Sequence, residues 1–106
     1  MKNYTEFSFS LPKGLIDSQG NLHQKGKIRS ATGADEILVA KDARVLRDQS
    51  YGVFVILSRL IISLGSLSKV TPQQLESLFL TDFYYLQKIY FQINQYPMES
   101  SFLGEF

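Results

Sequence analysis

The stretch VTPQQLESLFLTDFYYLQKIYFQIN, residues 70–94, contains the clearest start signal for a helix in the chain. Thr71 has a side chain suited to the N-cap, Pro72 occupies the first helical position, and Gln74 completes a capping box. Apolar residues then recur at helical spacing until a proline that follows the stretch prevents continuation. The sequence therefore predicts one long helix over residues 71–94.

The same helix carries more aromatic rings than a single core-facing stripe can accommodate. Contiguous apolar surface that stays exposed generally marks an interaction site, and tyrosine suits such a surface because its hydroxyl tolerates water. Packing inside the chain's own core is the alternative for most of these rings. We expect part of the set to bind another polypeptide, and the candidates are Phe79, Phe83, Tyr84, Tyr85, Tyr90 and Phe91.

One carboxylate interrupts the apolar side of this helix. Asp82 is seven positions from apolar residues in both directions, so a helix places it among them, where an unpaired charge would be costly. We expect a structural ion pair between Asp82 and Arg59, with Arg44 or Arg47 as alternative partners. A catalytic role would require a second titrating group, and the sequence suggests none.

Two earlier segments also have helical character. The apolar stretch YGVFVILSRLIISLG predicts a helix over residues 50–64, which is shorter than the ~20 residues of a membrane span and is interrupted by Arg59. We therefore expect a buried helix there. A second, shorter helix is predicted over residues 32–41, because Thr32 can cap it and acidic residues occupy its first turn.

The N-terminal part has the period of strands. Residues 5–11, TEFSFSL, alternate apolar and polar side chains as a half-buried strand requires. The following DSQG places Asp17 and Gly20 at the first and last positions of a type I turn. The returning arm NLHQKGKIR completes a β-hairpin over about residues 5–29.

Together these segments predict an α+β fold, in which an N-terminal β-hairpin is followed by about three α-helices, the last one longest. A chain of 106 residues is long enough for one modest core, and we place a single domain at residues 1–96. Residues 97–106 show no period and are expected to form a flexible or docking tail.

The returning arm of the hairpin predicts a basic row on one strand face, with Leu22 and Ile28 on the other face. We expect this row, including a surface histidine, to be solvated, and we expect no nucleic-acid binding because no aromatic residue lies among the basic ones to stack on bases. Contact with nucleic-acid phosphates is the alternative. The row consists of His23, Lys25, Lys27 and Arg29.

The residues that carry chemistry are too few for an enzyme. The chain has one histidine and no cysteine, so a nucleophile with a base and an orienting group is not indicated, and no cluster resembles a metal site. GKIRSATGAD, residues 26–35, lacks the spacing of a P-loop and of a dinucleotide fingerprint. We expect no enzymatic activity, no cofactor and no metal.

Charge and cysteine usage favour a cytoplasmic protein. The net charge of +1 gives no overall field to attract nucleic acid or an anionic membrane. The absence of cysteine suits a reducing compartment, and the first residues lack the pattern of a signal peptide. We expect a cytoplasmic location and no membrane association.

The order of segments resembles the family of small phage tail assembly chaperones, which also occurs with phage-tail-like contractile injection systems. The resemblance covers about residues 7–95. It rests on an opening strand with LPKG, a DSQG turn followed by LH, the ATGADE start of a helix, the LSRLIISLGSL segment and VTPQQLESLFLTDFYYLQ.

This resemblance implies a non-enzymatic cytoplasmic protein that supports assembly of a tail tube by binding the tape measure protein or another tail component. Some members of the family extend into a cysteine-bearing C-terminal part, whereas this chain contains no cysteine. The alternative is a structural subunit, or a subunit that self-assembles as a homo-oligomer and remains in the finished particle.

Overall fold

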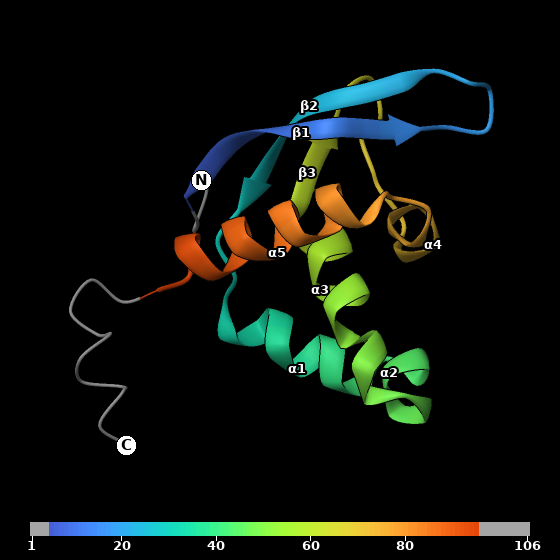
Figure 1. Cartoon of the computed structure of the whole chain (residues 1–106). Helices are drawn as coiled ribbons and strands as arrows, with labels where there is room; N and C mark the ends of the chain where they lie inside the picture. The colour runs from blue at the N-terminus through green and yellow to red at the C-terminus, as the bar shows by residue number, and fades with distance from the viewer. Residues whose placement is uncertain (1–4, 96–106) are drawn as a thin grey trace.

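The computed structural model describes residues 5–95, and in it three antiparallel strands and a set of helices form an α+β fold (Figure 1). The sheet has the order β1-β2-β3. Its strands are β1 (Glu6–Ile16), β2 (Leu22–Arg29) and β3 (Ile61–Leu64). The helices are α1 (Gly33–Lys41), α2 (Ala43–Arg47), α3 (Gly52–Leu60), α4 (Pro72–Glu76) and α5 (Leu80–Ile93), with a 3-10 turn at Gln49–Tyr51.

The predicted hairpin and the predicted longest last helix are both confirmed. β1 and β2 pair in antiparallel fashion, and the turn between them closes as expected, because the Gly20 amide donates to the Asp17 carbonyl at 2.9 Å. The expected tail at residues 97–106 lies outside the described residues.

The LPKG segment of β1 is a bulge. β1 and β2 stay in one register from Glu6 to Ser10 and resume in a shifted register at Leu15. Gly14 has a φ of 105°, which favours glycine, and a side chain there would collide with those of Leu22 and Gln24. The backbone amides of the bulge donate hydrogen bonds to a side chain of α5.

A single helix over residues 50–64 was the wrong prediction, because α3 ends at Leu60 and the chain continues as β3. Leu60, Ile61 and Leu64 are all buried. A short apolar run of this kind fits a buried helix and a buried strand equally well, and β-branched isoleucines favour the strand. The edge of β2 that does not pair with β1 decides between helix and strand. When residues 61–64 form β3, they pair with this edge and satisfy its backbone groups.

A continuous helix over residues 71–94 was also wrong, although its predicted capping box at Thr71 and Gln74 is confirmed. α4 ends at Glu76, the Ser77 hydroxyl donates to the Gln74 carbonyl at 2.7 Å, and Phe79 is extended at the N-cap of α5. Such a hydroxyl competes with the helical backbone pattern. The break lets α4 pack on α3 while α5 packs mainly on β1, which one straight helix could not do.

The predicted helix over residues 32–41 is confirmed as α1, with Thr32 at the N-cap. The linking segment after it contains an additional short helix, α2, whose N-cap is Asp42. Asp35 and Glu36 lie in the first turn of α1 and Asp42 caps α2, so both helices have negative charge near the N-terminal end, as the helix dipole favours.

The predicted basic row on β2 is only partly formed. His23 is buried, with its Nε2 2.8 Å from Asp17 Oδ2, and Arg29 is drawn into an ion pair with Asp35. The expectation of a surface histidine was therefore wrong, because the loop after β3 covers that end of the strand: the Ser66 amide donates to His23 Nδ1 at 3.4 Å.

The two apolar residues that were predicted to share one face of β2 differ in burial. Leu22 is 56% exposed at the end of the hairpin, while Ile28 is fully buried. Only Lys25 and Lys27 remain as exposed members of the row.

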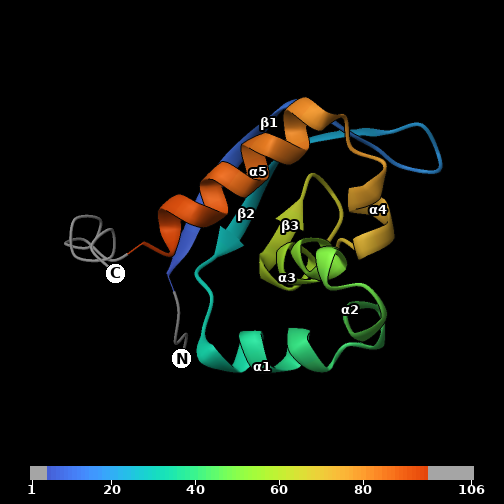
Figure 2. The ribbon, with the colours of Figure 1, turned by 60° about the horizontal axis from the view of Figure 1, so that its bottom comes forward.

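The core lies where the sheet, α3 and α5 meet, and Figure 2 shows α5 lying along β1. β1 contributes alternate residues to the core, and the helices contribute residues that are three and four positions apart. The fully buried side chains include Leu11, Leu15, Ile28, Leu57, Leu60, Leu64, Leu75 and Leu86.

Candidate protein-binding surface

The inner side of α5 is fixed to the sheet by a buried carboxylate. Asp82 is fully buried, and its two oxygens accept the backbone amides of Lys13 at 2.9 Å and Gly14 at 2.6 Å. Both amides belong to the β1 bulge. The predicted ion pair between Asp82 and Arg59 is therefore wrong, because backbone amides rather than a cation satisfy this carboxylate.

A tyrosine on α5 makes a similar contact further along β1. The Tyr85 hydroxyl accepts the Ser10 amide at 3.0 Å. Because β1 is an edge strand, amides that do not face β2 would otherwise be available to another strand. Asp82 and Tyr85 thus protect part of the free edge, and they set how α5 is rotated about its own axis.

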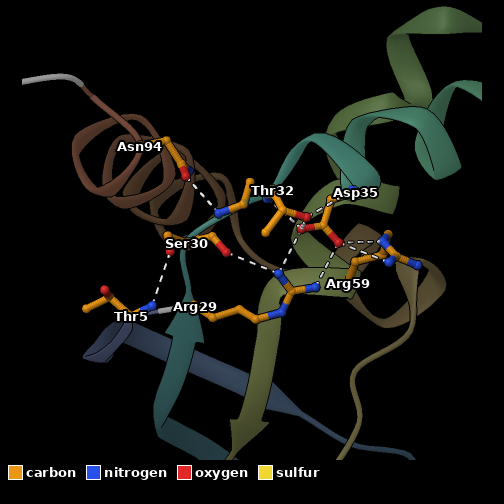
Figure 3. A network of polar contacts seen from close by, with 8 residues as sticks. Thr5, Arg29, Ser30, Thr32, Asp35, Arg59 and Asn94 are labelled. Carbon is orange, nitrogen blue, oxygen red and sulfur yellow. Dashed lines mark hydrogen bonds and ion pairs between the residues drawn. The ribbon is translucent and has the colours of Figure 1, made fainter. Parts of the chain in front are cut away.

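Arg59 instead belongs to a network around Asp35, which lies between two guanidinium groups in Figure 3. Arg29 forms a bidentate pair with Asp35, with both distances at 2.8 Å. Arg59 donates from Nε at 3.2 Å and from Nη2 at 2.9 Å, both to Asp35 Oδ1. The Thr32 amide completes the shell at 2.8 Å. This network joins β2, α1 and α3 at one point.

The network strongly favours the ionised form of Asp35. Hydrogen bonds from Arg29, and then from the Thr32 amide and Arg59, hold the pKa of Asp35 well below its usual range. Burial acts in the opposite direction and is outweighed. Asp35 therefore remains charged at neutral pH.

Three of the six candidate rings are partly buried within the chain: Phe83, Tyr85 and Tyr90. Phe83 stacks on Phe54 of α3, with ring centroids 4.8 Å apart. Burial, and secondly the charge of Glu36, raise the pKa of Tyr90. Phe83 thus holds α5 against α3, Tyr85 contacts β1, and Tyr90 lies beside Glu36 of α1.

The other three candidates are exposed. Phe79, Tyr84 and Phe91 have exposed fractions of 54%, 61% and 65%. Leu80, which the sequence reasoning did not single out, is 65% exposed beside them. Its spacing of four positions to Tyr84 and eleven to Phe91 was a signal that could have identified it.

We call Leu80, Tyr84 and Phe91 the outer ridge of α5. At 100° per residue the three side chains fall within about 40° of one another around the helix, and they extend over about 16 Å along its axis. The buried Asp82 and Leu86 lie on the opposite side. The ridge is therefore a narrow apolar stripe on a helix whose other side is held in place.

Phe79 extends the apolar surface beyond the start of α5. Lys13 from the β1 bulge places its Nζ 4.9 Å from the centroid of the Phe79 ring. An ammonium group over an aromatic face is a favourable arrangement. The start of α5 thus combines an exposed aromatic ring with a positive charge.

Two other properties of residues 5–95 bear on the kind of site. No helix in this part of the chain combines the length and the apolar character needed to cross a bilayer. The same residues contain no group of three or more histidine, aspartate or glutamate side chains placed to hold a metal ion.

Comparison with known proteins gives no relative: the chain matches no family model, no curated protein and no solved structure.

Proposed function

We propose that this protein is a non-enzymatic assembly chaperone that binds an amphipathic helix of a phage-tail component, such as the tape measure protein. The observation that carries the proposal is the outer ridge: Leu80, Tyr84 and Phe91 are each more than 60% exposed on one stripe of α5. Exposed apolar side chains gathered on one stripe of a helix, whose other side is held in place, indicate an interaction site.

The spacing of the ridge suits a helical partner. Leu80, Tyr84, Gln87 and Phe91 follow one another at intervals of four, three and four residues. This alternation is the one by which two helices pack side by side, and it needs no reactive residue. Tyrosine is also among the side chains that contribute most to protein interfaces. The ridge thus supports recognition by shape and apolar contact.

The resemblance to tail assembly chaperones supports a tail component as the partner. A chaperone for long amphipathic helices would cover their apolar faces before the tail assembles. The anchored inner side of α5 fits this role, since a rigid surface loses little conformational entropy on binding.

Substitution of the ridge tests the proposal. We expect the double variant Tyr84→Ser/Phe91→Ser to lose at least about 100-fold in affinity for the tape measure protein of the same gene cluster, since each central aromatic contact contributes roughly 2 kcal/mol or more. The measurement is co-expression and pull-down, followed by titration of the purified pair. Thermal unfolding should change little, because both side chains are mainly exposed.

Leu46→Ser provides a matched control, because Leu46 is 72% exposed on α2, away from the ridge. It should bind the tape measure protein like the wild type. Equal binding by the ridge variant and the control would overturn the assignment of the ridge, and the absence of any complex with the wild-type chain would overturn the proposed partner.

A structural or self-assembling subunit is the second candidate, because the same spacing allows two copies of α5 to pair. In that case the chain would be found at fixed stoichiometry in purified particles, and the ridge variant would reduce the mass measured by light scattering for the protein alone. A chaperone is expected to be absent from the finished particle.

A further inference from the structure

A concave site lies between the α1–α2 turn, α3 and the loop that precedes α4, and it has a volume of about 460 Å³. This volume falls within the usual range of small-molecule sites, about 300–1,000 Å³. Its polar lining consists of Asp42, Arg44, Ser58, Arg59, Lys69 and Thr71. Three cations and one carboxylate line it, so two positive charges are in excess.

Arg59 is one source of the excess. Arg29 already pairs with Asp35 through both of its terminal nitrogens, so Arg59 brings a second positive charge to a carboxylate that one arginine neutralises. Arg59 uses Nε and Nη2 for Asp35, and its Nη1 donates to none of residues 5–95. Figure 3 shows Arg59 on the side of Asp35 away from Arg29. About a third of its side chain is exposed, at 35%.

Lys69 is the other source. It is exposed, and it forms no ion pair within the part of the chain that the structure describes. Arg44 is neutralised by Asp42 through Nε at 3.0 Å and Nη2 at 2.8 Å, which leaves its Nη1 without a described acceptor. The Ser58 and Thr71 hydroxyls already donate to Val70 O and Gln74 Oε1. The donors available to a ligand are therefore cationic.

The carboxylates near the site are fixed in their ionised form. Hydrogen bonds from Arg44 lower the pKa of Asp42 to about 2, and those from Arg29 hold the pKa of Asp35 below its usual range. Neither carboxyl group can take up a proton and become a donor at neutral pH. The surplus of positive charge is thus a permanent property of the site, and a concave site concentrates such a field.

We propose that this pocket binds the phosphate group of a small molecule. A phosphate group carries about −1.5 to −2 charges at neutral pH, which matches the excess of two positive charges. Its several oxygens can accept from Arg44, Arg59 and Lys69, which approach from three different elements. A carboxylate has only one negative charge and two oxygens, so it would leave part of this arrangement unused.

Calorimetric titration of the full chain at pH 7.5 tests this inference. The ligands are inorganic phosphate and phosphoserine, compared with acetate and chloride at equal ionic strength. We expect one phosphate per chain and binding at least about tenfold tighter than that of acetate, because charge-assisted hydrogen bonds are the strong ones. Tighter binding of phosphoserine would identify an organic phosphate as the ligand, and equal binding would identify the free ion.

Two lysine variants provide the matched pair for this titration. Lys69→Gln should weaken phosphate binding by roughly tenfold, the loss expected for one hydrogen bond to a charged group. Lys27→Gln makes the same charge change at an exposed lysine on the sheet and should leave the affinity unchanged. In the NMR spectrum, the Arg59 Nε–Hε signal should shift as phosphate is added.

Three results would overturn the proposal: phosphate binding no tighter than acetate binding, equal losses in the two lysine variants, or an Arg59 signal that does not move while phosphate binds. The titration does not involve a tail protein, so its outcome is independent of the chaperone proposal.

Discussion

Asp82→Asn is expected to lower the free energy of unfolding by about 3 kcal/mol, because hydrogen bonds to a charged group contribute about 1.5–3 kcal/mol each and the buried carboxylate accepts two. An amide in its place keeps one acceptor oxygen and turns an NH₂ group toward a backbone donor. For a domain of this size the loss corresponds to a decrease in Tm of roughly 10–20 °C. Urea unfolding and thermal melting measure it.

Asp48→Asn is the matched control for this substitution. The Asp48 carboxylate is exposed and accepts the Ser50 amide at the start of the 3-10 turn, a capping role that asparagine performs equally well. We expect the Asp48→Asn variant to have the same free energy of unfolding as the wild type. Hydrogen exchange at Lys13 and Gly14 should accelerate in the Asp82 variant alone, and an effect as small as that of Asp48→Asn would contradict the anchoring role of Asp82.

Asp35→Asn is expected to be similarly costly, at about 3 kcal/mol at neutral pH, because removal of one partner from a buried ion pair leaves an uncompensated charge. Here Arg29 and Arg59 both lose their anion at the junction of β2, α1 and α3. Asp42→Asn is the comparison, since the pair of Asp42 with Arg44 is more exposed and should contribute little.

The cost of Asp35→Asn should depend on pH. The folded-state pKa of Asp35 is depressed, whereas an unfolded carboxyl titrates near pH 3.9, so its contribution to stability is complete above about pH 5 and is lost as the pH falls below about 4. Asp17, whose pKa is lowered to about 2 first of all by its hydrogen bond with His23, changes stability in the same direction.

Urea unfolding of the wild type and the Asp35 variant between pH 2 and 7 measures this dependence. The difference between the two proteins should be largest at neutral pH and should shrink toward pH 2. A difference that stays constant over this range would show that the Asp35 charge does not contribute to stability.

Local signals in the sequence determined a large part of this fold. The alternation of β1, the DSQG turn, the capping boxes at Thr32 and Thr71, and the helical period of α5 each depend on a few neighbouring residues. The free energies of caps and tight turns arise within one turn of chain, so they can be assigned without knowledge of the rest of the molecule.

The burial of individual side chains could not be assigned in this way. Asp82 and Arg59 were correctly recognised as groups in need of partners, but the partners proved to be the amides of the LPKG bulge and Asp35. No pattern of residue types predicts which backbone amides a bulge leaves available to another element. His23 likewise became a core residue only because a distant loop covers it.

What the sequence alone determined is the α+β class, the hairpin, the starts of α1 and α4, and the excess of aromatic residues in the last helical segment. What the tertiary structure decided is that LIISL divides into a helix end and a strand, that the last helical segment breaks at Ser77, and which rings form the outer ridge. The reason is physical: helix caps and turns are local interactions, whereas strand pairing, ion-pair partners and exposure depend on residues that only the folded chain brings together.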